Sequence, residues 1–154
     1  MQPIIYDVAV SLDGFIAGPD GDVSLFDMTG PVAEDYGARL AAYSTAIMGR
    51  ATYEFGYAYG LAPGQNPSPG LATVVFSTTL ETEPDSEIDV VPEDWETAIA
   101  DLRKAATAPV YLCGGGDFAG WLLERGLIQH LILKRAPCLY GSGTRLFGGS
   151  KEMR

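Results

Sequence analysis

The stretch from Val110 to Phe118, VYLCGGGDF, passes from an apolar run into three consecutive glycines and then into a helical pattern. The apolar run has the composition of a buried strand, and Gly126 is placed to end the helix in a left-handed conformation. Glycine has no Cβ, so a phosphate group can approach the backbone closely, facing the free N–H groups of the helix that opens near Asp117. The same turn also joins strands to helices in proteins that bind nothing there. A phosphate site at Gly114, Gly115 and Gly116 is therefore one of two interpretations.

Strand-like and helix-like segments alternate along the rest of the chain. Strands are predicted over residues 3–10, 45–48, 72–76, 88–91, 110–113 and 128–135, and helices over 31–43, 93–106 and 117–126. Turn-rich connections are predicted over 11–21, 56–70 and 136–147. This alternation predicts an α/β fold, with a mostly parallel central sheet and helices on both faces. At 154 residues we expect a single domain over residues 1–154.

The composition argues against several classes of protein. A formal net charge of −10 disfavours nucleic acid as a partner. The sequence has no apolar run near the ~20 residues of a membrane span, and its start lacks a basic signal-peptide region. With only Cys113 and Cys138 we expect no disulfide and a cytoplasmic location. One histidine and two distant cysteines also predict no metal site.

Polar residues suited to phosphate follow three of the predicted strands. These segments are Gly49-Arg50-Ala51-Thr52, Ser77-Thr78-Thr79 and the three glycines. The carboxyl ends of parallel strands meet at one edge of a sheet, where ligands bind. Arg50 can pair with a phosphate through two N–H groups, and the hydroxyls of Ser77 and Thr78 can hold a ribose phosphate. Each segment alone also fits an ordinary turn or cap.

The order of the motifs SLDGFIAGPDG, MGRATYE, VVFSTTL, VYLCGGGDFAGWLLERGL and APCLYGSGTRLF resembles the dihydrofolate-reductase-like family. The sequence is most similar to stand-alone relatives of the reductase domain of the bifunctional riboflavin-biosynthesis deaminase-reductase. The resemblance covers nearly the whole chain. It implies NADPH as hydride donor and a homodimer. Relatives have one or two more strands after the position of Arg154, so either a last hairpin lies outside this sequence or the sheet is completed differently.

Carried over residue by residue, the resemblance implies a cofactor site. Arg50 and Thr52, beside Gly49, would contact the NADPH phosphates, and Ser77 and Thr78 the 2′-phosphate side. The three glycines and Asp117 would face the pyrophosphate and nicotinamide end. Residues flanking the Asp13 turn would form the wall of the nicotinamide pocket: Ala9, Ile16 and Gly18. Two positions depart from the riboflavin-pathway pattern, with Phe15 in place of a lysine and Cys113 in place of a glutamate.

Three carboxylates are the catalytic candidates. Asp13 either shapes its glycine-flanked turn or contacts a ligand near the nicotinamide. Glu34 and Asp35 either complement the dipole of the helix that begins near Pro31 or occupy the place of the carboxylate that binds a pterin ring in dihydrofolate reductases. A buried carboxylate there would have a raised pKa and would relay a proton to the substrate.

The expected activity is NADPH-dependent reduction of a small heterocycle. An undefined pteridine-like or pyrimidine-like ring ranks first as substrate, followed by the ribosylaminouracil of riboflavin synthesis and then dihydrofolate. The alternative is a non-catalytic nucleotide-binding or regulatory module on the same fold, because none of the candidate carboxylates is an unambiguous proton donor.

Overall fold

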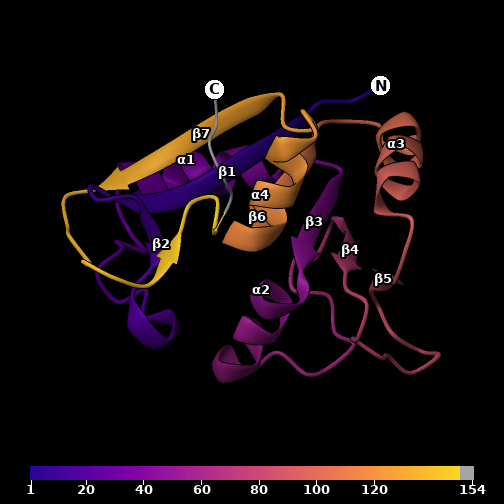
Figure 1. Cartoon of the computed structure of the whole chain (residues 1–154), viewed down its shortest axis with the longest axis horizontal. Coiled ribbons are helices and arrows are strands. Elements are labelled where there is room, and N and C mark those ends of the chain that lie inside the picture. The colour runs from indigo at the N-terminus through magenta and orange to yellow at the C-terminus, as the bar shows by residue number, and fades with distance from the viewer. Residues whose placement is uncertain (150–154) are drawn as a thin grey trace.

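The computed structural model describes residues 1–149, and a six-stranded sheet forms its centre (Figure 1). The strands are β1 (Ile4–Ser11), β3 (Thr45–Gly49), β4 (Ala72–Phe76), β5 (Asp89–Val91), β6 (Val110–Gly114) and β7 (His130–Ala136). They lie in the order β5-β4-β3-β6-β1-β7, and every neighbouring pair is parallel. The mostly parallel sheet predicted from the sequence is confirmed.

Helices cover both faces of the sheet. The α-helices are α1 (Pro31–Leu40), α2 (Arg50–Phe55), α3 (Trp95–Ala105) and α4 (Gly116–Glu124), and two 3-10 turns are η1 (Pro19–Gly21) and η2 (Gly56–Tyr59). Ile99 of α3 and Leu122 of α4 belong to one core cluster, and α1 packs with Tyr36 and Leu40 against a second cluster. In Figure 1, α4 lies in front of the sheet and α1 behind it. The predicted two-sided arrangement is confirmed.

Side-chain alternation along β1 divides the core between the two faces. Ile4 and Tyr6 are fully buried in the cluster that holds α3 and α4, whereas Ile5 packs against the cluster that holds α1. This is the two-residue period of a strand with both faces covered. Asp7 continues the alternation, which points its carboxylate toward Arg39 of α1.

A second, two-stranded antiparallel sheet lies within segments that were predicted to be loops. It consists of β2 (Phe15–Ala17) and β8 (Thr144–Arg145). Strands of three and two residues are too short for a periodic pattern, so the sequence reveals neither of them. The Phe15 side chain is buried, and the Arg145 guanidinium lies 5.1 Å from the centre of its ring.

Two predicted helix ends can be compared with the structure. The first long helix ends at Leu40 rather than Tyr43, and the Tyr43 hydroxyl instead donates a hydrogen bond to Asp7. Gly126 has a φ of +67°, and the amide of Leu127 donates to the carbonyl of Leu122. The predicted left-handed end of α4 is therefore confirmed.

Among residues 1–149 no helix combines the length and apolar character needed to cross a membrane.

Candidate functional site

A cleft of about 660 Å³ opens at the carboxyl ends of β3 and β6. This first cleft contains residues from two of the three strand ends that the sequence singled out. The segment after β3 contributes Gly49, Arg50, Ala51 and Thr52. The glycine segment contributes Gly115 and Gly116, and Asp117, which follows it, also lines the cleft. Its volume is within the range of small-molecule and cofactor sites.

Arg50 and Thr52 form one side of the first cleft. The Arg50 guanidinium is about half exposed and donates hydrogen bonds to Glu54 and to the hydroxyl of Thr79. The Thr52 hydroxyl lies against Gly115, where an added Cβ would come within 2.8 Å of it. The absence of a side chain at Gly115 therefore leaves the Thr52 hydroxyl and the adjoining backbone open to the cleft.

Gly116 has a packing role that the sequence did not indicate. A Cβ at this position would overlap the carbonyl oxygen of Arg145 and would lie 2.9 Å from the amide nitrogen of Gly148. The Asp117 carboxylate accepts a hydrogen bond from the amide of Gly149 at 3.4 Å. The segment that follows β8 therefore crosses the first turn of α4, and this close approach requires glycine.

Aromatic rings form another part of the lining of the first cleft. The rings of Phe76 and Phe118 stack with centroids 5.0 Å apart, and Trp95 packs edge-on against both of them. Trp121 lies 5.3 Å from Trp95, ring centre to ring centre. All four residues line the cleft, and Trp95 and Trp121 are the two tryptophans of the chain. A flat ring entering the cleft would meet an apolar surface suited to stacking.

A second cleft, of about 490 Å³, lies beside the first and between α1 and β7. Its lining includes Ala9, which the sequence analysis placed in the nicotinamide wall, together with Tyr36, Asp27 and Lys134. The two clefts share three apolar lining residues: Val8, Ile16 and Val23. The two clefts therefore adjoin each other along these three side chains.

A buried ionic cluster lies beside the second cleft. The Asp7 side chain is fully buried and accepts hydrogen bonds from Arg39 at 2.7 and 3.0 Å and from Tyr43 at 2.8 Å. The Lys134 ammonium nitrogen lies 3.6 Å from the same carboxylate. Burial raises the pKa of Asp7, but the hydrogen bonds from Arg39 and Tyr43 and the charge of Lys134 outweigh burial, so the pKa is below its usual value.

Two tyrosines connect this cluster to the neighbouring strand. The hydroxyls of Tyr36 and Tyr111 are hydrogen-bonded to each other, and burial raises the pKa of Tyr36 to about 12. Burial also raises the pKa of Cys113, which lines the first cleft at the end of β6. These groups are therefore protonated at neutral pH.

Several residues proposed from the sequence lie outside the lining of both clefts. Ser77 is buried, and its hydroxyl accepts hydrogen bonds from the amides of Thr79 and Leu80. Thr78 is exposed, and it is the Thr79 hydroxyl that accepts a hydrogen bond from Arg50. Glu34 and Asp35 are exposed on α1, outside the second cleft.

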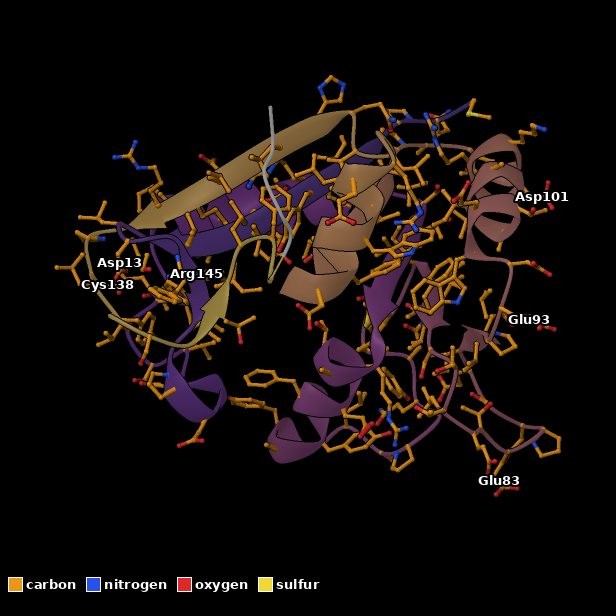
Figure 2. All side chains as sticks on the ribbon, in the orientation of Figure 1. Asp13, Glu83, Glu93, Asp101, Cys138 and Arg145 are labelled. Carbon is orange, nitrogen blue, oxygen red and sulfur yellow. The ribbon has the colours of Figure 1, made fainter. Side chains whose placement is uncertain are left out.

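Asp13 and Gly18 occupy the turns near β2. The Asp13 carboxylate accepts hydrogen bonds from the Ser11 hydroxyl at 2.6 Å and from the amides of Tyr140 and Gly141 at 3.2 and 2.7 Å. A Cβ at Gly18 would overlap the Tyr140 ring. Figure 2 shows Asp13 and Arg145 at the same end of the molecule, far from Asp101 on α3. Asp13 thus joins its own turn to the loop that contains Tyr140 and Gly141.

The buried ionic cluster beside the second cleft was not predicted from the sequence. Asp7 and Lys134 each interrupt an apolar strand, at IIYDVAV and LILKRAP. A charged residue inside a strand with two covered faces needs a buried partner, and this was the available signal. The identity of that partner depends on strand pairing, which the sequence does not reveal.

The sequence profile of the RibD C-terminal domain matches residues 2–153. The chain belongs to the RibD C-terminal domain family. Two curated relatives come from Bacillus subtilis (strain 168). The uncharacterized protein YwjB is 28% identical, with 95% of this chain and 82% of YwjB covered. The uncharacterized protein YyaP is 26% identical, with 97% of this chain and 82% of YyaP covered.

Solved structures of RibD-type proteins share the fold. One, from Shewanella sp. PV-4, is described as a riboflavin biosynthesis protein; it matches with a TM-score of 0.80 and 25% identity, covering 99% of this chain and 86% of that one. The Thermotoga maritima diaminohydroxyphosphoribosylaminopyrimidine deaminase/5-amino-6-(5-phosphoribosylamino)uracil reductase matches with a TM-score of 0.73 and 18% identity. That alignment covers 99% of this chain and 49% of the bifunctional protein. The RibD and dihydrofolate-reductase-like fold predicted from the sequence is confirmed.

Proposed function

We propose that this protein is an NADPH-dependent reductase of a small, flat heterocycle, with the cofactor in the first cleft and the substrate in the second. The observation that carries the proposal is the shared wall. Val8, Ile16 and Val23 line both clefts, so the two clefts adjoin, and a nicotinamide ring at the edge of the first would lie next to a substrate ring at the edge of the second. Hydride transfer requires this kind of close approach between two rings.

The residues of the first cleft fit a dinucleotide. Arg50 supplies a guanidinium at its exposed edge, and Thr52 supplies a hydroxyl beside the bare backbone of Gly115. A guanidinium pairs strongly with a phosphate, and the aromatic wall suits a planar base. With the 2′-phosphate we associate Arg50, which lines the cleft, and Thr79, whose hydroxyl accepts a hydrogen bond from Arg50. Ser77 and Thr78 have no such contact with a residue of the cleft.

The bound cofactor would supply the hydride, and the protein would supply position and a dry environment. Lining residues of both clefts are mostly apolar near the shared wall, which would exclude water from the reacting atoms. Tyr36 and Lys134 of the second cleft are the polar groups that would orient the substrate. RibD-type reductases as relatives agree with this class of reaction.

Tryptophan fluorescence and NADPH absorbance test the proposal together. NADPH should quench the emission of Trp95 and Trp121, since both line the first cleft. The absorbance of NADPH is then followed after the addition of each candidate substrate: dihydrofolate, the phosphoribosylaminouracil and simple pteridines. Steady oxidation with one of them supports a reductase. Tight NADPH binding without oxidation would identify a nucleotide-binding module, and an absence of binding would overturn both functions.

A further inference from the structure

The buried cluster beside the second cleft contains two cations and one carboxylate. Both oxygens of Asp7 already accept hydrogen bonds from Arg39, and one accepts a third bond from Tyr43. Lys134 lies 3.6 Å from Asp7, which is an ion-pair distance but longer than a direct hydrogen bond. One carboxylate cannot neutralise two cations, so the cluster has an excess positive charge at its Lys134 end.

Strand pairing directs Lys134 into the second cleft. In the parallel register of β1 and β7, Lys134 lies opposite Ala9 and Ile132 opposite Asp7, so Lys134 shares a face with Asp7. The Lys134 side chain is 14% exposed, and the residue lines the second cleft. Its ammonium nitrogen lies 3.2 Å from the centre of the Tyr36 ring, and the face of this ring attracts the positive charge. An ammonium group has three N–H donors, so Lys134 can still donate a hydrogen bond to a molecule in the cleft.

We infer that Lys134 is the proton donor to the substrate in the second cleft. This role rests on the proposed reductase function. When a C=N or C=O bond of the heterocycle accepts a hydride at carbon, the electron pair of that bond moves onto the nitrogen or oxygen. That atom then takes a proton from the Lys134 ammonium, which forms the new N–H or O–H bond and leaves Lys134 neutral. Lys134 regains its proton from water after product release.

The environment of Lys134 suits this role. Burial lowers its pKa, the charge of Asp7 raises it, and the nearby Arg39 lowers it again, so the net result is a more acidic ammonium than a surface lysine. The hydroxyl of Tyr36 is a much weaker acid, with its pKa raised to about 12 by burial. Asp27 and Arg135 also line the cleft, but both residues are exposed to water.

A lysine-selective NMR titration tests the acidity and access of Lys134 without requiring turnover. The sequence has three lysines, Lys104, Lys134 and Lys151, and Lys134→Arg identifies the signal of interest by removing it. We expect Lys134 to lose its proton at a lower pH than the exposed Lys104. Saturating 5,6-diaminouracil, a small oxo-pyrimidine, should shift the Lys134 signal and move its midpoint to higher pH. A Lys134 signal that titrates like that of Lys104, or that ignores the probe, overturns the proposal.

Kinetics separate a proton donor from a structural cation. Lys134→Arg preserves the charge beside Asp7 but holds its proton too tightly to release it at neutral pH. With the substrate identified in the panel, it should lower kcat by about 10²- to 10⁴-fold, with KM changed only a few-fold. In the unmodified protein, kcat should fall as the pH rises and Lys134 loses its proton. This fall should be absent from the pH profile of Lys134→Arg. Lys104→Arg is the matched control and should change neither quantity.

The two proposals fail in different ways. Without NADPH oxidation by the unmodified protein, the reductase function and the donor role both fall, whatever the NMR titration shows. If NADPH is oxidised and Lys134→Arg retains its kcat and pH profile, the reductase function stands and Lys134 is not the donor. NADPH should quench the tryptophan fluorescence of the Lys134 and Lys104 variants as strongly as that of the unmodified protein. Thermal unfolding of Lys134→Arg and Lys134→Met checks that a loss of rate does not reflect unfolding.

Discussion

The Nε atom of Arg39 lies 2.7 Å from a carboxylate oxygen of Asp7, and this pair joins α1 to strand β1 of the sheet. Asp7 is fully buried, whereas Arg39 is about a third exposed. If one partner of a buried ion pair loses its charge, the other charge remains buried without compensation, and this destabilises the folded protein. The stability of the domain should therefore depend strongly on the charge of Asp7.

Asp7→Asn should lower the free energy of unfolding at pH 7 by about 3 kcal/mol, because it leaves Arg39 and Lys134 without their carboxylate. The pKa of Asp7 in the folded protein is below its usual value. Its contribution is therefore complete above about pH 4 to 5 and is lost as the pH falls through the folded pKa. Urea denaturation from pH 7 to pH 2 measures this, with the exposed Asp101→Asn as control. A difference that persists unchanged at low pH would contradict the ionic explanation.

Gly116→Ala should destabilise the protein by about 1 to 3 kcal/mol, because the added methyl group meets the backbone of Arg145 and Gly148. Gly37→Ala in α1 is the matched control, since no atom lies within 4 Å of its added Cβ. That change should stabilise the helix by about 0.5 to 1 kcal/mol. Denaturant midpoints of the two variants should thus move in opposite directions. Equal effects would mean that Gly116 has no special packing role.

Arg50→Ala and Glu54→Gln should change NADPH affinity in opposite directions. Arg50→Ala removes the guanidinium, so the dissociation constant should rise about 10- to 100-fold and the preference for NADPH over NADH should shrink. Glu54→Gln removes the carboxylate that now pairs with Arg50, so affinity should increase several-fold, more at low salt. Tryptophan fluorescence titrations measure both, with Lys104→Ala as control. Unchanged NADPH preference in Arg50→Ala would show that the phosphate binds elsewhere.

Asp13→Ala should release the loop that contains Tyr140 and Gly141, because the Asp13 carboxylate accepts hydrogen bonds from both amides. Hydrogen exchange at these amides should become faster. Asp22→Ala is the control, since the Asp22 carboxylate bonds within its own turn, to the amide of Ser24. Tight NADPH binding should persist in both variants. A large loss of hydride transfer without faster exchange would instead favour contact between Asp13 and a ligand.

Most helices and strands could be predicted from the sequence because their apolar periodicity is a local property. The strand-glycine-helix unit from Val110 to Glu124 is an example, down to the left-handed Gly126. The convergence of Arg50 with Gly115 also followed from a general rule, that the carboxyl ends of parallel strands share an edge. Ser77 and Thr78 lie outside both clefts, although the sequence suggested that they contact a ligand. A hydroxyl at a strand end can instead accept hydrogen bonds from the amides of its own turn, as the Ser77 hydroxyl does.

By itself, the sequence determined the order of strands and helices, the parallel α/β class and the glycine-bearing edge where a ligand can approach. Only the tertiary structure decided which distant side chains meet. Asp7 and Lys134 are far apart along the chain, and only the pairing of β1 with β7 brings them onto one face. The short pairing of β2 with β8 was likewise invisible beforehand. Local patterns specify local backbone structure, whereas a buried charge finds its partner only once the sheet order and register exist.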